Sequence, residues 1–547
     1  MGKLLAVLFT GVLLLGIQSR AALAGPAAGA HCSRPAVGSA VTPPPDLFSA
    51  GGTLKVDMDY LTDLDEASRT LFCFRTTEGA QSPTLRVKPG ETLDLTVHNK
   101  VPALPAGSPT EVISDKSNAC GSAVMTETSV NVHFHGTNIS PACGSDQVIR
   151  TLVNSGETFH YHLQFPANEP PGLYWYHPHV HGIAEAAVQG GASGLIVVDG
   201  IERVQPALAG LPERVLVVRD QTVAGSAMPG GAVPSWDVSL NDVSIASPAL
   251  TPAVIRMAGH GREFWRLANA SADTILDLQL AYDGAVQPLD IVALDGVPTG
   301  SQDGTRHGHP VRMDHILLPP AGRAEFVIPP PPPGTKLAVL RTLKIDTGPV
   351  GDNDPARDLA TVSIDDGSAP DLRVIPSASE QPAPQRFEGM ERAAVTAHRK
   401  LYFSEVLSDP NDPASPTNFY ITVDGAKPVL FDPANPPAIT TTEGAMEDWT
   451  IENRSREVHS FHMHQIHFKV LQQNGVAVPP AERQFRDTVQ VPYWSGEGPY
   501  PSITVRMDFR GMVVGDYVYH CHILGHEDNG MMAIIRVLPA SRSSVAG

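Results

Sequence analysis

The chain has 547 residues, enough for several domains, and its 50 prolines and 48 glycines suit a protein built from many short strands and turns. Aspartate and glutamate (58) outnumber lysine and arginine (39), so the formal net charge is −19. A strongly acidic chain is repelled by phosphate backbones, which excludes nucleic acid as an expected partner, and segments with helical periodicity are scarce.

The first 24 residues are expected to be a secretory signal. Lys3 precedes an apolar run from Leu4 to Ile17, and the small residues Ala22-Leu23-Ala24 form a cleavage site. A membrane anchor is the alternative, but the run is shorter than the ~20 residues that span a bilayer. No twin-arginine pair is present, so we expect export through the general route, to the periplasm or the medium. Loss of Lys3 and Arg20 with the signal would take the net charge from −19 to −21.

A first strand-rich unit is predicted over residues 45–200, after a loose arm rich in Pro, Gly and Ala. Within it, His133 and His135 form one H-x-H pair, and His177 and His179 form another. Alternate residues of a strand point to the same face, so both histidines of a pair can reach one metal centre. The pair His160 and His162 lies in an alternating strand between these motifs, and we expect it on a solvated strand face.

The second unit, residues 201–366, carries no H-x-H pair at the end of a strand. His307 and His309 flank Gly308 in a predicted loop and are expected to be exposed. A polar connector, residues 367–399, then leads to the third unit, residues 400–540. All three units contain a glycine followed by a strand that ends in asparagine, namely Gly90 to Asn99, Gly259 to Asn269 and Gly444 to Asn453.

The third unit contains the most informative segment, Tyr519-His520-Cys521-His522-Ile523, followed by His526 and Met531. Strand alternation places His520 and His522 on one face and Cys521 on the other, so one strand can serve two metal centres. Cys521, His526 and Met531 supply most of the His2Cys set with an axial thioether that is typical of blue-copper electron-transfer sites.

An internal repeat indicates how the units are related. Tyr174 to His179 and Tyr517 to His522 share the pattern Y-x-Y-H-x-H, with Pro178 in the position that Cys521 occupies. Only the C-terminal copy can therefore bind blue copper. Three β-sandwich units are predicted, with metal in the outer two, which must meet face to face because each supplies half of the remaining histidines.

Seven H-x-H pairs occur where chance placement of 21 histidines would give roughly one. Four of the clusters, including His459-Ser460-Phe461-His462-Met463-His464, follow the order of the multicopper oxidase superfamily, which the chain resembles over nearly its whole mature length. The superfamily includes laccases, ascorbate oxidase and copper-efflux oxidases. The resemblance implies an all-β fold of three cupredoxin-like Greek-key β-sandwich domains. Ser460 and Gln465 depart from the commonest residues, proline and glycine, at positions that bind no metal.

The resemblance also implies four coppers per chain. The type 1 ligands would be His459, Cys521, His526 and Met531, although Met532 competes as the axial ligand. The type 2 copper would be held by His133 and His462. The type 3 pair would be held by His135, His177, His179, His464, His520 and His522.

The implied reaction is oxidation of a small electron donor at the type 1 site, coupled to reduction of dioxygen to water. We expect a laccase-like enzyme acting on phenols, aminophenols or similar donors. The alternatives are a periplasmic cuprous oxidase in copper tolerance, a bilirubin-oxidase-like activity, and a non-enzymatic copper-storage protein. The chain has 13 methionines but no methionine-rich loop, and only Met390 lies in the long connector, which favours an organic donor over Cu(I).

Carboxylates near the copper could relay the protons that dioxygen reduction consumes. Family position indicates Glu527, directly after a ligand, and Asp146, although residues 141–145 lengthen the loop before Asp146. The alternative is that both are acidic loop residues. His181 and His467 lie just beyond ligand motifs, and we expect them to be structural.

Four cysteines remain besides Cys521, an even number in a chain expected to be exported. Three pairings are open, and we favour Cys120 with Cys143 and Cys32 with Cys73. The alternative is four buried free thiols.

Overall fold

The computed structural model describes residues 31–114, 116–223, 233–259, 261–365, 367–378, 385–412 and 415–540. The predicted secretory signal lies outside these residues. The described chain is almost entirely β-structure, as the sequence predicts, with two short α-helices, α1 (Ala184–Gln189) and α2 (Leu524–Asp528). None of the helices in the described ranges has the length and apolarity needed to cross a membrane.

The first domain is a sandwich of two sheets with two small strand pairs beside it. One sheet has the order β1 (Asp46–Phe48), β4 (Thr84–Val87), β13 (Gly194–Val198), β12 (Gly172–His177) and β9 (His133–His135). The other has the order β11 (Thr158–Gln164), β5 (Thr92–Asn99), β2 (Thr53–Leu64) and β3 (Thr70–Thr76). The small pairs are β10 (Thr151–Leu152) with β7 (Cys120–Gly121), and β6 (Thr110–Val112) with β8 (Val124–Thr126).

The second domain is a larger sandwich. Its first sheet runs β16 (Val243–Ile245), β15 (Trp236–Leu240), β14 (Glu213–Thr222), β18 (Glu263–Asn269), β25 (Arg323–Ile328), β21 (Leu289–Leu294) and β22 (Val297–Pro298), with β23 (Val311–Met313) also on β21. Its second sheet runs β17 (Ala253–Met257), β27 (Arg357–Ile364), β26 (Ala338–Thr342), β19 (Leu276–Tyr282) and β20 (Ala285–Gln287), with β24 (Ile316–Leu318) also on β19.

The third domain repeats the two-sheet plan. One sheet runs β29 (Thr417–Val423), β28 (Ala397–Leu407), β31 (Met446–Asn453), β37 (Ser502–Asp508), β33 (Phe468–Gln473) and β34 (Val476–Ala477), with β35 (Phe485–Arg486) also on β33. The other runs β30 (Ile439–Thr442), β39 (Met532–Leu538), β38 (Gly515–Cys521), β32 (His459–Met463) and β36 (Thr488–Val491).

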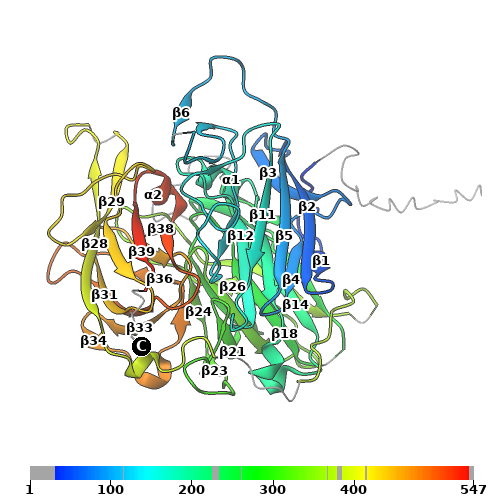
Figure 1. The fold of residues 1–547 in the computed structure, drawn as a ribbon. Coiled ribbons are helices and arrows are strands. Elements are labelled where there is room, and N and C mark those ends of the chain that lie inside the picture. The colour runs from blue at the N-terminus through cyan, green and yellow to red at the C-terminus, as the bar shows by residue number, and fades with distance from the viewer. Residues whose placement is uncertain are drawn as a thin grey trace, which may run out of the picture.

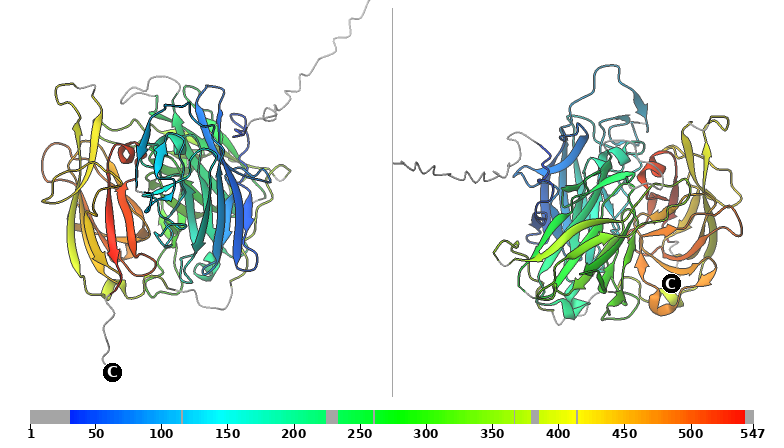
Figure 2. Two further views of the ribbon diagram at one scale, coloured as in Figure 1. Left: turned by 45° about the horizontal axis from the view of Figure 1, so that its top comes forward. Right: turned by 180° about the vertical axis from the view of Figure 1, so that it is seen from behind.

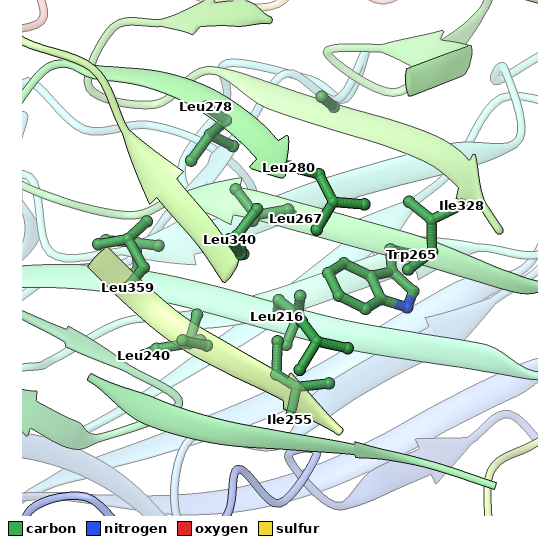
Figure 3. Packing of buried hydrophobic residues seen from close by; sticks show 14 of the residues in the cluster. Leu216, Leu240, Ile255, Trp265, Leu267, Leu278, Leu280, Ile328, Leu340 and Leu359 are labelled. Atoms are coloured by element: carbon green, nitrogen blue, oxygen red, sulfur yellow. The ribbon is translucent and has the colours of Figure 1, made fainter. Parts of the chain in front are cut away.

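Strand alternation builds each core. In β5 the residues alternate strictly between partly exposed and buried, with Leu93, Leu95 and Val97 facing inward. The second domain has a large apolar cluster that includes Trp265 and Leu267, which Figure 3 shows packed between the two sheets. The outer domains differ in carrying the buried histidines of the predicted motifs.

The predicted glycine-to-asparagine repeat corresponds to equivalent strands. The strands β5, β18 and β31 each end in asparagine, and each pairs in parallel with an earlier strand. The side-chain amides of Asn269 and Asn453 donate to backbone carbonyls of the loops that follow, and that of Asn99 donates to the carbonyl of Val153, which precedes β11. The recurrence of asparagine therefore has a physical cause, since a buried loop carbonyl needs a donor.

The third domain, coloured yellow to red, lies against the first domain, coloured blue to cyan, in both Figure 1 and Figure 2. The green middle domain contacts both of them. Two disulfides, Cys32–Cys73 and Cys120–Cys143, stabilise the first domain and confirm the predicted pairing. Cys521 is a buried free cysteine.

Candidate metal centres

Three side chains of the third domain converge on one point. His459 begins β32, Cys521 ends β38, and His526 lies on α2. His459 Nδ1 is 3.0 Å from His526 Nδ1, and Cys521 Sγ is 3.7 Å and 3.8 Å from these two nitrogens. A triangle of this size accommodates one metal ion, because metal–nitrogen and metal–sulfur bonds are about 2.0 and 2.3 Å long.

The two neighbouring methionines pack on different sides of the chain. Met531 is fully buried in the hydrophobic cluster that contains Cys521, and its carbonyl accepts a hydrogen bond from the Cys521 N–H at 3.1 Å. Met532 belongs to a different cluster, with Val518 and Phe431. Of the two, Met531 is therefore the one that shares a hydrophobic cluster with Cys521.

His526 is the accessible edge of this centre. Its side chain is 11% exposed, whereas His459 and Cys521 are fully buried. Phe419 stacks on the His526 ring with centroids 4.3 Å apart, and Glu457 Oε1 lies 3.5 Å from His526 Nε2. The small pocket beside His526 is also lined by Asp273, Asp352 and Asp354 from the second domain.

A second cluster lies between the first and third domains. The Nε2 atoms of His179, His464 and His520 are 3.1–3.3 Å apart. Stacked rings join the two domains. The ring centroids of His133 and His464 are 3.8 Å apart, and those of His135 and His462 are 4.0 Å apart. The cluster consists of eight buried histidines, four from each domain: His133, His135, His177, His179, His462, His464, His520 and His522.

Several ring nitrogens in this cluster have no hydrogen-bond partner in the described structure. They include His133 Nε2, His135 Nδ1, His177 Nε2, His462 Nε2 and both nitrogens of His522. A buried polar atom without a partner costs about 1–3 kcal/mol, so the cluster is shaped to bind something in addition to protein. A set of imidazoles suits copper and other first-row transition metals.

The protonation state of the ligands also favours metal. Burial, with the neighbouring rings next, lowers the pKa of His133 and His464 well below the usual value, so these imidazoles are neutral and can coordinate at neutral pH. Burial raises the pKa of the Cys521 thiol to about 12. A coordinated cation would remove that proton, because metal-bound thiols are deprotonated.

One strand connects the two centres. β38 pairs with β32 so that His520 lies opposite His462 and Cys521 lies opposite Phe461. Alternation sends His520 and His522 into the histidine cluster and turns Cys521 toward His459 and His526. The structure therefore brings together all of the histidine and cysteine residues that the sequence predicts for the two centres.

Two predicted carboxylates contact the histidine cluster. Asp146 Oδ1 is 3.0 Å from His133 Nδ1, and Asp146 also accepts the Phe134 N–H at 3.0 Å. Glu527 Oε2 is 3.0 Å from His520 Nδ1, and Glu527 Oε1 is 3.5 Å from His179 Nδ1. Both carboxylates are buried, so neither is an ordinary acidic loop residue. Burial raises the pKa of Asp146 well above its usual range.

A third carboxylate at the cluster, Asp487, was not predicted. It is fully buried immediately before β36, and its Oδ1 lies 3.3 Å from His135 Nε2. Asp487 lies outside every histidine motif, so no local pattern indicates it. Only the pairing of β32 with β36 brings it to the cluster.

The remaining histidines occupy the positions expected of them. His160 and His162 are exposed on β11, and His307 and His309 are exposed in a loop. His467 is buried, and its Nε2 donates to the Asp295 carbonyl at 2.7 Å. His181 packs edge-on against Phe431 with centroids 4.8 Å apart.

The chain is similar to known multicopper oxidases over most of its length. Residues 123–202 and 410–541 each match a multicopper oxidase domain family. The chain is 25% identical to a multicopper oxidase of Staphylococcus aureus, over 74% of this chain and 76% of the relative, and 26% identical to a laccase of Haloferax volcanii, over 73% and 66%. Among solved structures, a multicopper oxidase of Campylobacter jejuni, titled a metallo-oxidase, covers 92% of this chain and 96% of its own at 20% identity, with a TM-score of 0.64.

A further solved structure agrees on the fold. The McoA multicopper oxidase of Aquifex aeolicus has a TM-score of 0.64 at 18% identity and covers 91% of this chain and 99% of its own. The sandwich domains are therefore cupredoxin-like, as the sequence predicts.

Proposed function

Because the chain belongs to the multicopper oxidase superfamily, whose members use copper and dioxygen, we propose that it is a laccase-like oxidase of small organic donors. The observation that carries this proposal is the placement of His520, Cys521 and His522. Three consecutive residues join a Cys-His-His centre near the surface to a buried cluster of eight histidines. Such a covalent link suits transfer of electrons from an outer donor to an inner acceptor.

The proposed ligand set has twelve residues and four coppers. His459, Cys521, His526 and Met531 would hold type 1 copper. His133 and His462 would hold type 2 copper, and the other six histidines of the cluster would hold the type 3 pair. The convergent nitrogens and the unpartnered buried ring atoms support this assignment.

Bound copper supplies one-electron transfer at the first centre and four-electron reduction of dioxygen to water at the second. The chain positions these ions and controls access. The partly exposed ring edge of His526 is the point where a donor can approach the first centre. Glu527 and Asp146 are placed to hold protons beside His520 and His133, and we propose them as the proton relay.

Phenols, aminophenols and related aromatic donors are the proposed substrates. Phe419, stacked on His526, offers an aromatic face, and Glu457 offers an acceptor for a phenolic O–H or an amine N–H. No methionine lines the small pocket beside His526, so no soft thioether is offered there to Cu(I). Relatives named as laccases agree with this choice.

Oxidation of a metal cation is the second candidate, favoured by one observation. Asp273, Asp352, Asp354 and Glu457 converge on the pocket beside His526, and repulsion among carboxylates is relieved by a bound cation. A bilirubin-oxidase-like activity is a further variant of the organic-donor proposal.

Oxygen uptake distinguishes these candidates. Copper-loaded protein is supplied with a phenol, an aminophenol, bilirubin, chelated Cu(I) or Fe(II), each with Cys521→Ser as the control. We expect the phenol or aminophenol to give the highest kcat/KM, and excess free copper to change it little. A strong preference for Cu(I) or Fe(II), or activity that requires excess copper, would replace the organic-donor proposal by the second candidate.

Metal content tests the ligand assignment independently of the substrate. Well-loaded protein should contain close to four coppers per chain and be blue, and Cys521→Ser should lose the blue absorption while keeping most of the remaining copper. Finding a single copper per chain would contradict the histidine-cluster assignment.

A further inference from the structure

Arg323 belongs to the middle domain, which contributes no ligand to either centre, yet its guanidinium reaches the histidine cluster. Arg323 is fully buried at the start of β25. Its Nη1 and Nη2 donate to Asp487 Oδ1 and Oδ2 of the third domain at 2.8 Å and 2.5 Å. Its Nε donates to the Leu173 carbonyl of the first domain at 3.2 Å. One side chain thus joins all three domains beside the cluster.

Asp487, held by this two-pronged contact, touches two cluster histidines from different domains. Its Oδ1 lies 3.3 Å from His135 Nε2 of the first domain. Its backbone carbonyl lies 2.7 Å from His462 Nδ1 of the third domain. Each contact places the imidazole proton on the nitrogen that faces Asp487, because a carboxylate or carbonyl oxygen accepts and cannot donate.

The opposite nitrogens are the ones without partners. His135 Nδ1 and His462 Nε2 are buried and make no hydrogen bond in the described structure. These lone pairs are therefore available to metal, and the rings are fixed, because His135 and His462 stack with centroids 4.0 Å apart. A hydrogen bond to the far nitrogen of a metal-binding histidine selects the tautomer and the orientation of the ring.

Local packing leaves no room for the Arg323–Asp487 pair to shift. Gly136 follows His135 with φ = +84°, and a Cβ at this position would lie 2.5 Å from Asp487 Oδ2 and 2.6 Å from Arg323 Nη2. Asp295, also from the middle domain, accepts the backbone N–H groups of Arg323 and Asp487 at 2.8 Å and 3.3 Å. The glycine of the first motif is thus required by the contact between Arg323 and Asp487.

We propose that Arg323 is a positioning residue for the copper cluster: by fixing Asp487, it sets the tautomer and ring orientation of His135 and His462. This inference rests on the proposed copper ligands. The middle domain, which contributes no ligand, would thereby influence the geometry of the histidine cluster. Lysine in place of Arg323 would keep a positive charge but lose the planar fork that holds both Asp487 oxygens.

The matched control is Arg214. It belongs to the same domain, is equally buried, and donates from Nε and Nη2 to both oxygens of Glu263 at 2.7 Å and 2.9 Å, away from the cluster. Arg214→Lys and Arg323→Lys therefore remove the same kind of interaction. Only the second removes it beside the proposed ligands.

The experiment uses copper-loaded protein and measures the type 2 electron paramagnetic resonance spectrum, copper content, and stopped-flow rates of donor reduction and of reoxidation by dioxygen. For Arg323→Lys we expect a shifted type 2 hyperfine coupling and reoxidation at least tenfold slower. The blue absorption and the rate of reduction by the donor should stay within twofold of wild type. Arg214→Lys should leave the type 2 spectrum, the copper content, the blue absorption and both rates unchanged, whatever it does to thermal stability.

If Arg323→Lys does not fold, Arg323→Leu/Asp487→Leu provides the second test, because removing both buried charges leaves neither unpaired. It should also shift the type 2 spectrum. Unchanged type 2 spectra and reoxidation rates in a folded Arg323 variant would overturn the positioning role while leaving the proposed function intact. A wild-type protein without a type 2 signal after full loading would overturn the proposed function and this assignment together.

Discussion

At the scale of single residues, burial decides which state of each group is stable. His133 and His464 are neutral because desolvation penalises their protonated form, and the same burial keeps the Cys521 thiol protonated without a cation. Neutral imidazoles are ready to coordinate a cation, whereas the Cys521 thiol must first lose its proton to one. The capacity to bind metal therefore depends on the exclusion of water as well as on the identity of the side chains.

Replacing Met531 should change the redox potential of the first centre. A thioether donates more electron density to oxidised copper than a hydrocarbon does, so Met531→Leu removes stabilisation of the oxidised state. We expect the type 1 potential to rise by roughly 60 mV or more, equivalent to a tenfold change in the one-electron equilibrium. Redox titration of the blue absorption measures it.

Met532→Leu is the control for that measurement, because Met532 packs with Val518 and Phe431 away from Cys521. Its type 1 potential should equal that of wild type. A rise with Met532→Leu and none with Met531→Leu would mean that the axial assignment is wrong.

Glu169 should make the first domain less stable as the pH rises. Burial raises the pKa of Glu169 from 4.5 to about 7, and the partners that favour its ionised form include Arg386 and the Asn138 N–H. Between about pH 4.5 and pH 7 the folded state then binds more protons than the unfolded state, so stability falls as the pH rises through this window. The shift corresponds to about 3 kcal/mol.

Glu169→Gln removes this titration. Urea denaturation at pH 4.5 and pH 8, followed by a probe in the first domain, should show the variant losing about 3 kcal/mol less stability than wild type over that interval. Equal losses in the two proteins would contradict the raised pKa.

At the scale of elements, the period of two along a strand accounts for most of what the sequence predicts correctly. Alternation separates Cys521 from His520 and His522, and it places His160 and His162 on the exposed face of β11. These conclusions need no knowledge of tertiary structure, because the direction of a strand side chain is a local property. The fold class follows from the same short, repeated patterns.

What the sequence does not predict is set by pairings between distant strands. Asp487 reaches His135 across 352 positions of the chain, and Arg323 reaches Asp487 across 164. A lone buried aspartate or arginine has no periodic pattern around it to indicate its partner. Family position indicates Glu527 and Asp146 but no residue of the middle domain.

The side chain of Asn269 should stabilise the middle domain by donating hydrogen bonds to backbone carbonyls. Its Nδ2 donates to the Thr274 carbonyl at 2.9 Å and to the Leu318 carbonyl at 3.0 Å, and all three groups are buried. Asn269→Ala leaves both carbonyls without this donor, so we expect the free energy of unfolding of this domain to fall by about 2–3 kcal/mol. Denaturant unfolding measures the loss.

Gln287→Ala, at a partly exposed position of the same domain, should have little effect on stability. The blue absorption should be unchanged in both variants, because neither residue touches a ligand. A cost below about 0.5 kcal/mol for Asn269→Ala would show that water replaces the amide in the loop.

At the scale of the whole molecule, the histidine cluster is an interface between domains. Each outer domain supplies four of its rings, and the middle domain holds both of them through Arg323. Neither outer domain can complete the cluster alone. Metal bound there therefore stabilises the association of the domains as well as each sandwich.

Removing copper should consequently lower the melting temperature and change the shape of the transition. A ligand that binds only the folded assembly stabilises it by about 4 kcal/mol when its free concentration is a thousand times its Kd. We expect calorimetry of the copper-free protein to show the first and third domains unfolding at lower temperature, separately from the middle domain, whose apolar core contains no ligand. Restoring copper should merge these transitions. Superimposable traces with and without copper would contradict a metal site shared between domains, because no ligand that bridges two domains can leave their unfolding unchanged.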